Sequence, residues 1–163
     1  MNANASPAAR AALLIGLFSA AGKLGDYGVQ TDTCARLKGA HDDAPVVETD
    51  EHGAVVARHG SAAGRRACLV HVTTYTATQA AAVLAANRVL GLGLRPGRIA
   101  LALGISATTH YFADRRRPLK RLADAVGKGP FYQLSAPGMS GAKELDQMWH
   151  RVWEAVAAVL AAR

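Results

Sequence analysis

The chain has 163 residues, half of them hydrophobic, and a formal net charge of +7. This length and apolar content suit one domain over residues 1–163 and exclude an intrinsically disordered or collagen-like chain. Two cysteines are too few for a disulfide scaffold or a thiolate zinc site, so Cys34 and Cys68 are predicted to be reduced, buried thiols. No apolar run reaches the ~20 residues of a membrane span, and we expect a cytoplasmic protein without such a span. The excess of Lys and Arg lies in residues 61–163, which predicts an anionic partner.

The first third of the chain contains a predicted strand and a predicted hairpin. The apolar run Ala11–Leu17 is expected to be a buried strand, followed by a glycine-punctuated turn. A short signal peptide is the alternative for this segment, because Arg10 precedes the run and small residues follow it. Residues 45–57 are typical of a hairpin that turns at Glu51, His52 and Gly53.

The rest of the chain alternates apolar runs with helical segments, a rhythm that predicts an α/β fold with helices around a sheet. Three short apolar runs are predicted to be buried strands: Ala67–Val72, Arg98–Ile105 and Phe131–Leu134. Three segments are predicted to be helices: Thr78–Leu90, Leu119–Val126 and Lys143–Ala162. The last of these is amphipathic, with one face formed by Leu145, Met148, Trp149, Val152, Val156, Val159 and Leu160.

Three local motifs point to other functions. Residues 99–106 are similar to the start of a helix-turn-helix, and Arg115, Arg116 and Arg117 would then lie near DNA phosphates, so a DNA-binding regulator is the alternative function. Residues 17–24 resemble a phosphate-binding loop, but the first glycine stands one position too early and a leucine replaces the metal-binding hydroxyl. The Gly91-x-Gly93 pair is typical of a helix end rather than of a dinucleotide site.

The six histidines show no spacing of a metal-binding motif. They stand at positions 41, 52, 59, 71, 110 and 150. Each is predicted to be structural or solvated, and His71, in an apolar run, is expected to be a core histidine with its hydrogen bonds satisfied. We therefore expect no metal site and no cofactor.

Three stretches, taken in order, resemble the N-terminal half of the β-ketoacyl-acyl-carrier-protein synthases, which have the thiolase-like fold. They are residues 14–39 (LIGLFSAAGKLGDYGVQTDTCARLKG), residues 80–106, which end in RIALALGIS, and residues 129–145 (GPFYQLSAPGMSGAKEL). The resemblance implies a thiolase-like half, with layered helices around a mixed sheet. It also implies that the third stretch carries a nucleophile elbow, where the family has its catalytic cysteine.

The chain departs from that family at the elbow and beyond it. Gly138 stands at the position of the cysteine and has no side chain with which to attack a thioester. Ser135 and Ser140 lie nearby, but neither matches the position and neither has an adjacent base. The chain ends after the elbow helix, so the histidine and lysine partners of the family's C-terminal half have no counterpart. The segment between Ser106 and Gly129 is also shorter than in the family.

A half-synthase without a nucleophile is expected to be a non-catalytic partner of an active ketosynthase, of the chain-length-factor type, in fatty-acid or polyketide (possibly polyene) biosynthesis. The resemblance implies a heterodimer in which this chain shapes the acyl tunnel. The residues expected near the interface and tunnel are Phe131, Tyr132, Leu134, Met139 and Trp149. A basic surface would dock an acidic acyl carrier protein, and the residues expected there are Arg115, Arg116, Arg117, Lys120 and Arg121.

Overall fold

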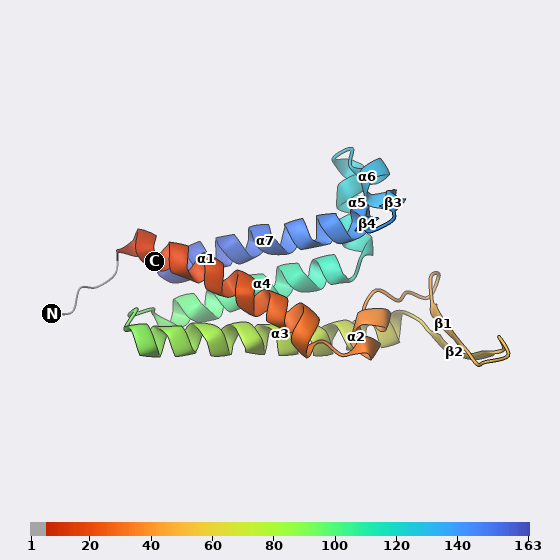
Figure 1. The fold of residues 1–163 in the computed structure, drawn as a ribbon, viewed down its shortest axis with the longest axis horizontal. Helices are drawn as coiled ribbons and strands as arrows, with labels where there is room; N and C mark the ends of the chain where they lie inside the picture. Colours follow the sequence, from red (N-terminus) through yellow and green to blue (C-terminus); the bar gives the residue numbers. More distant parts are fainter. Residues whose placement is uncertain (1–5) are drawn as a thin grey trace. The chain divides into compact units, whose positions relative to one another are not determined.

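A computed structural model describes residues 6–163, which are mostly helical (Figure 1). Helix α1 (Pro7–Lys23) continues into a π-helical segment, η1 (Leu24–Val29). A short helix and a hairpin follow, α2 (Asp32–Leu37), β1 (Val46–Thr49) and β2 (Val55–His59). Two long helices come next, α3 (Ser61–Leu90) and α4 (Pro96–Asp114). The chain ends with α5 (Arg117–Ala125), α6 (Gly129–Gln133), β3 (Ser135–Ala136), β4 (Met139–Ser140) and α7 (Gly141–Ala162).

The chain divides into two compact units. Unit 1 comprises the described part of Met1–Val29 with Thr73–His110 and Gln147–Arg163. Unit 2 comprises Gln30–Val72 and Tyr111–Asp146. The two units are described separately below, and one domain over residues 1–163 stays a prediction.

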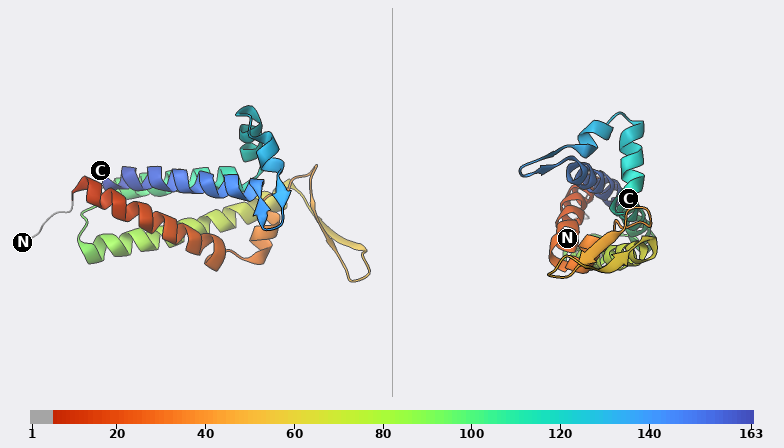
Figure 2. Two further views of the ribbon diagram at one scale, coloured as in Figure 1. Left: turned by 45° about the horizontal axis from the view of Figure 1, so that its top comes forward. Right: turned by 90° about the vertical axis from the view of Figure 1, so that its right-hand side faces the viewer.

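Unit 1 is a four-helix arrangement of α1 and the parts of α3, α4 and α7 that belong to it, which run side by side in Figures 1 and 2. Its apolar core contains Leu14 and Phe18 from α1, neither of them exposed to solvent. Alanines on α4 and α7 complete the core, and their small side chains allow the helices to approach closely. The core residues of these helices include Ile99, Ala102, Ala157, Ala158, Ala161 and Ala162.

Unit 2 joins short helices to two small antiparallel sheets. Strands β1 and β2 form a hairpin in which Val46 pairs with His59, and Ser135 of β3 pairs with Ser140 of β4. The Thr31 hydroxyl caps α2 by accepting a hydrogen bond from the Cys34 N–H. Cys34 and Cys68 are free and buried, as predicted.

The predictions of secondary structure are confirmed for the helices and the hairpin and are wrong for the strands. Ala11–Leu17 lies in α1, Ala67–Val72 lies in α3, Arg98–Ile105 lies in α4 and Phe131–Gln133 lies in α6. Short apolar runs cannot be assigned to strand or helix by periodicity alone. These runs are rich in alanine and leucine, which are strong helix formers, and most of them continue into longer helices.

The fold therefore contains helices and strands, but the helices dominate. The strands of residues 6–163 form two separate two-stranded antiparallel sheets. The layered mixed sheet of a thiolase-like half is not seen in this part of the chain. Gly91 (φ +60°) follows the end of α3 in a left-handed conformation, which confirms the predicted helix end, and Gly127 (φ +74°) has the same role after α5.

One helical segment of the described chain, Pro7–Val29, is long and apolar enough to cross a membrane by length and composition alone. Only 28% of its most apolar window is buried. The core helix of a soluble protein and a signal sequence satisfy the same criterion, so the absence of a membrane span stays a prediction.

Candidate functional site: a buried histidine and carboxylate cluster

Unit 1 contains only two acidic residues, half-buried Asp26 and buried Glu154, and both lie beside histidines. Asp26 is carried by the π-helical segment η1, a type of helix that occurs frequently at functional sites. Glu154 follows His150 by one turn of α7, which places both side chains on the same face of that helix. Glu154 is 6% exposed and His150 is 5% exposed. Burial of the Glu154 carboxylate requires partners that compensate for the loss of water.

His110, from α4, stands between Asp26 and His150. Its Nε2 atom lies 3.5 Å from Asp26 Oδ1, and its side chain is 1% exposed. The imidazole rings of His110 and His150 stack at a centroid distance of 4.0 Å with planes 10° apart. A ligand atom of His110 lies within 4.8 Å of one of Asp26, and, as a separate pair, a ligand atom of His110 lies within 4.8 Å of one of His150. Segments η1 and α7 thus each place one side chain beside His110 of α4, a carboxylate in one case and an imidazole in the other.

A chain of hydrogen bonds connects this cluster to the polar residues of α3 and α4. The Tyr75 hydroxyl donates to Glu154 Oε1 at 2.6 Å and accepts a hydrogen bond from Gln79 Nε2 at 3.0 Å. Ser106 Oγ donates to Gln79 Oε1 at 2.7 Å. Every member of the chain is buried, so the chain fixes the position of the Glu154 carboxylate from one side. The ring of Tyr75 also packs against His110, at a centroid distance of 3.8 Å.

Burial governs the protonation of this network. It raises the pKa of the Glu154 carboxyl above its ordinary value, and the hydrogen bond from Tyr75 opposes that rise. Burial and the neighbouring Glu154 charge also raise the pKa of Tyr75, which therefore stays a hydrogen-bond donor. The charges of His150 and Lys23 also lower the pKa of Glu154, but less than burial raises it.

Two glycines allow the helices to approach the cluster closely. A Cβ atom on Gly22 of α1 would overlap Glu154 Oε1 and come within 2.9 Å of the Tyr75 hydroxyl oxygen. A Cβ atom on Gly25 would lie 2.8 Å from Cδ2 of the Tyr75 ring. The glycine backbone of α1 and η1 therefore packs directly against the side chains of Glu154 and Tyr75.

The cluster matches the chemistry of a divalent transition-metal site. Imidazole and carboxylate groups are the usual ligands of Zn²⁺, Mn²⁺ and Fe²⁺. Metal–ligand bonds of about 2.1 Å place neighbouring ligand atoms roughly 3–4 Å apart, and the separation between His110 and Asp26 falls in this range. Metal sites in helical bundles are commonly built from side chains that project inward from different helices.

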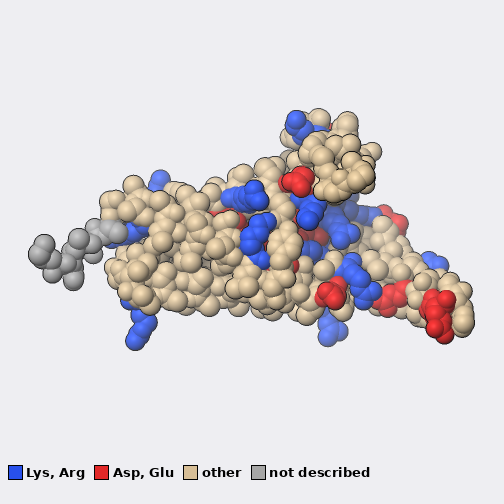
Figure 3. Space-filling model, viewed as in Figure 1, with Lys and Arg blue, Asp and Glu red and all other residues tan. Residues whose placement is uncertain are grey.

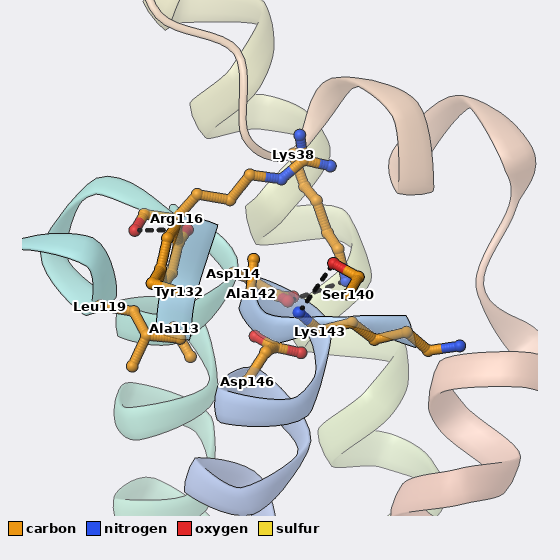
Figure 4. A pocket seen from close by; sticks show the side chains of 10 residues that line it. All are labelled: Lys38, Ala113, Asp114, Arg116, Leu119, Tyr132, Ser140, Ala142, Lys143 and Asp146. Atoms are coloured by element: carbon orange, nitrogen blue, oxygen red, sulfur yellow. Dashed lines mark hydrogen bonds and ion pairs between the residues drawn. The ribbon is translucent and has the colours of Figure 1, made fainter. Parts of the chain in front are cut away.

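Unit 2 contains a separate polar cavity of about 480 Å³ (Figure 4). In Figure 4, Lys38 extends toward Ser140 and Asp114, and its Nζ atom lies 2.8 Å from Asp114 Oδ1. Asp114 also lies 3.2 Å from His71 Nε2, so the prediction that His71 is a core histidine is confirmed for its burial, although it lies on a helix. The lining residues are Lys38, Ala113, Asp114, Arg116, Leu119, Tyr132, Ser140, Ala142, Lys143 and Asp146.

The five cations predicted to dock an acyl carrier protein have different roles. Arg115 is 5% exposed, and its guanidinium donates to the carbonyl oxygens of Lys38 (2.6 Å) and Ala40 (2.8 Å), so the docking prediction is wrong for this residue. Figure 3 shows Lys and Arg side chains gathered near the end of α4 and the start of α5. Of the other four cations, two form ion pairs and two are exposed: Arg117 pairs with Asp43, Lys120 pairs with Asp124, and Arg116 and Arg121 are exposed.

The residues predicted for an acyl tunnel are divided between the units. Phe131 and Tyr132 lie on α6, Leu134 follows it, and Met139 lies on β4, all in unit 2. Trp149 belongs to unit 1, where its indole N–H donates to Thr109 O at 2.9 Å.

The predicted nucleophile elbow has the geometry of a hairpin. Gly138 has φ +77° in the turn between β3 and β4, and α7 starts three residues later. Pro137 and Gly138 are the central residues expected of a type II turn. Ser135 is exposed on β3, and Ser140 accepts a hydrogen bond from the Lys143 N–H at the start of α7.

Sequence reasoning missed the cluster in unit 1. It treated His110 and His150 as scattered and did not single out Asp26 or Glu154. One signal was available: His150 and Glu154 stand four residues apart in an otherwise alanine- and valine-rich helix.

Comparisons of the chain with known protein families, with curated proteins and with solved structures found no match.

Proposed function

We propose that unit 1 binds a divalent first-row transition-metal ion at His110, together with His150 and Asp26, while Glu154 accepts the hydrogen bond of the Tyr75 hydroxyl. The observation that supports this proposal is that the only two acidic residues of unit 1, buried Glu154 and half-buried Asp26, lie beside two stacked histidines. A surface role would not require these charges in the interior. A bound cation compensates the buried carboxylates and offsets the cost of their desolvation.

The donor set also limits the class of metal. The cluster offers nitrogen and oxygen atoms, which suit Zn²⁺, Mn²⁺ or Fe²⁺. Neither cysteine belongs to unit 1, so the described cluster contains no thiolate that would favour Cu⁺. Tyr75, Gln79 and Ser106 would then act as outer partners that hold Glu154 in place.

Calorimetric titration of untagged protein with Zn²⁺ and with Mn²⁺ tests the proposal. The wild-type protein is expected to bind one ion per chain. His110→Ala and His150→Ala should each weaken the affinity at least about tenfold, about 1.4 kcal/mol. His52→Ala is the matched control, because the His52 side chain is 83% exposed and lies in unit 2, and it should leave the affinity unchanged.

Circular dichroism of each variant separates loss of ligands from loss of fold. A folded wild-type protein that takes up no ion, or folded His110→Ala and His150→Ala variants that bind as tightly as the wild type, would overturn the proposal. In the first case the cluster would be a purely hydrogen-bonded core network.

We also retain, as a second proposal, a non-catalytic partnership with an active ketosynthase and its acyl carrier protein. It is favoured by the exposure of three apolar residues near Gly138, namely Phe131 (36%), Leu134 (44%) and Met139 (37%). The helical conformation of Arg98–Ile105 removes one of the strands on which the resemblance depends. Co-expression with a ketosynthase tests this proposal, since a stoichiometric heterodimer is expected and independent elution of the two chains would contradict it.

The alternative of a DNA-binding regulator depends on a helix-turn-helix at residues 99–106. Residues 99–106 lie within the single continuous helix α4, so these residues contain no turn between two helices. The cytoplasmic location stays a prediction.

A further inference from the structure

We propose that the cavity of unit 2 binds a small molecule that carries a phosphate group, with Arg116 as the residue that recognises the phosphate. This proposal is independent of the metal site in unit 1, because all of the lining residues belong to unit 2.

Arg116 is the cation of this cavity that is available for a ligand. The Lys38 ammonium is engaged with the buried carboxylate of Asp114, and Figure 4 shows the Lys143 side chain extending away from the cavity. The Arg116 guanidinium forms no ion pair within residues 6–163. Its Cδ, Nε and Cζ atoms lie so close to Gly39 that a Cβ atom there would overlap them, so a residue without a side chain allows Arg116 to extend across the cavity.

The backbone at Arg116 is unusual and holds the side chain in this direction. Its φ of +58° and ψ of −51° are close to those of a classic γ-turn, and the Arg117 N–H donates to the Arg115 carbonyl at 2.6 Å across it. The residues on both sides are anchored, since Arg115 is buried and Arg117 pairs with Asp43. Such strained conformations persist where the surroundings determine them, and they occur frequently at ligand sites.

Further donors line the cavity opposite Arg116. The Ser140 hydroxyl precedes α7, and Ala142 and Lys143 contribute the first turn of this 22-residue helix. Because the Lys143 N–H already donates to Ser140 Oγ, the Arg116 guanidinium and the Ser140 hydroxyl are the donors that suit a phosphate. Asp146 also lines the cavity and disfavours an anion close to it, so the phosphate is expected between Arg116 and Ser140, away from the Asp146 carboxylate.

The size of the cavity indicates that the ligand is larger than a phosphate ion. A volume of about 480 Å³ falls in the range of small-molecule sites. Its other wall is apolar and aromatic, formed by Ala113, Leu119 and the Tyr132 ring. We therefore infer a phosphate monoester whose organic part packs against this wall.

Titration calorimetry with phenyl phosphate, inorganic phosphate and phenol tests the inference. The full chain is used with a chelator present, so that a metal ion in unit 1 cannot bind the phosphate. Phenyl phosphate is expected to bind more tightly than either of the other two probes. Arg116→Gln should weaken its binding at least tenfold, Arg116→Lys should weaken it less, and added salt should weaken it in the wild type.

Arg121→Gln is the matched control, because it removes the same charge from an exposed arginine that does not line the cavity. It should change the affinity less than twofold. Absence of binding to the folded wild type, equal binding of phenol and phenyl phosphate, or equal weakening by Arg116→Gln and Arg121→Gln would overturn the inference. None of these outcomes depends on whether unit 1 binds a metal.

Discussion

Two alanine substitutions in the same helix should have opposite effects on the stability of unit 1. Gly16 and Gly22 both lie in α1, but a Cβ atom on Gly16 would meet no packing neighbour within 4 Å, whereas a Cβ atom on Gly22 would overlap the Glu154 carboxylate. Gly22→Ala must displace Glu154 and break its 2.6 Å hydrogen bond with Tyr75. Gly16→Ala only reduces the flexibility of the helix.

The magnitudes follow from this difference. Loss of a buried hydrogen bond to a charged group costs about 1.5–3 kcal/mol. Alanine has a helix propensity about 1 kcal/mol more favourable than that of glycine, which offsets part of this loss. Gly22→Ala is therefore expected to lower the free energy of unfolding by about 0.5–2 kcal/mol, or about 1–8 °C in Tm. Gly16→Ala is expected to raise it by about 0.5–1 kcal/mol.

The two tryptophans provide the assay. Trp149 and Trp153 both belong to unit 1, so tryptophan fluorescence during urea unfolding reports on this unit alone. Equal or greater stability of Gly22→Ala relative to Gly16→Ala would refute the close packing of α1 against the Glu154 carboxylate.

Three further predictions concern other buried groups. Tyr75→Phe removes the donor to Glu154 and should cost about 1–3 kcal/mol of unfolding free energy by the same fluorescence assay; an unchanged midpoint would contradict this. Arg115→Met leaves the backbone carbonyl oxygens of Lys38 and Ala40 without their donor and should lower the unfolding free energy of unit 2 by more than about 1.5 kcal/mol. Circular-dichroism unfolding measures this change. The control Arg121→Met should stay within about 0.5 kcal/mol of the wild type. Burial raises the pKa of the Cys68 thiol from 9.0 to about 12. Its reaction with a thiol reagent should therefore be slow at pH 8, accelerate as the pH rises and become fast on unfolding. Rapid labelling of the native protein at pH 8 would exclude the buried position.

How far the sequence predicts this fold depends on the length of each pattern. The segment Lys143–Ala162 shows helical periodicity over many turns and forms α7, and the turn residues around Gly53 correctly indicate the hairpin. Arg98–Ile105 is too short to distinguish a buried strand from one stretch of a buried helix. This segment is helical in the structure, where Ile99 and Ala102 pack against alanines of α7 in the core of unit 1.

The candidate sites were predictable only in part. Asp26, His110 and His150 lie far apart in sequence, and only the packing of η1, α4 and α7 brings them together. Arg116 and Ser140 were singled out for other reasons, namely charge and a possible nucleophile. Their common cavity depends on the turn at Arg116 and on the start of α7, neither of which has a local signature in the sequence.

The central claim is that the buried cluster of unit 1 is a metal site, and the visible absorption spectrum of the protein with Co²⁺ tests it most directly. Nitrogen and oxygen ligands from a closed protein site alter the d–d bands of this ion relative to the hydrated ion. The wild type and His52→Ala are predicted to show altered bands that saturate at about one Co²⁺ per chain, and the double variant His110→Ala/His150→Ala is predicted to lose them. A spectrum of the hydrated ion in the folded wild type, or identical spectra in the wild type and the double variant, would contradict the account.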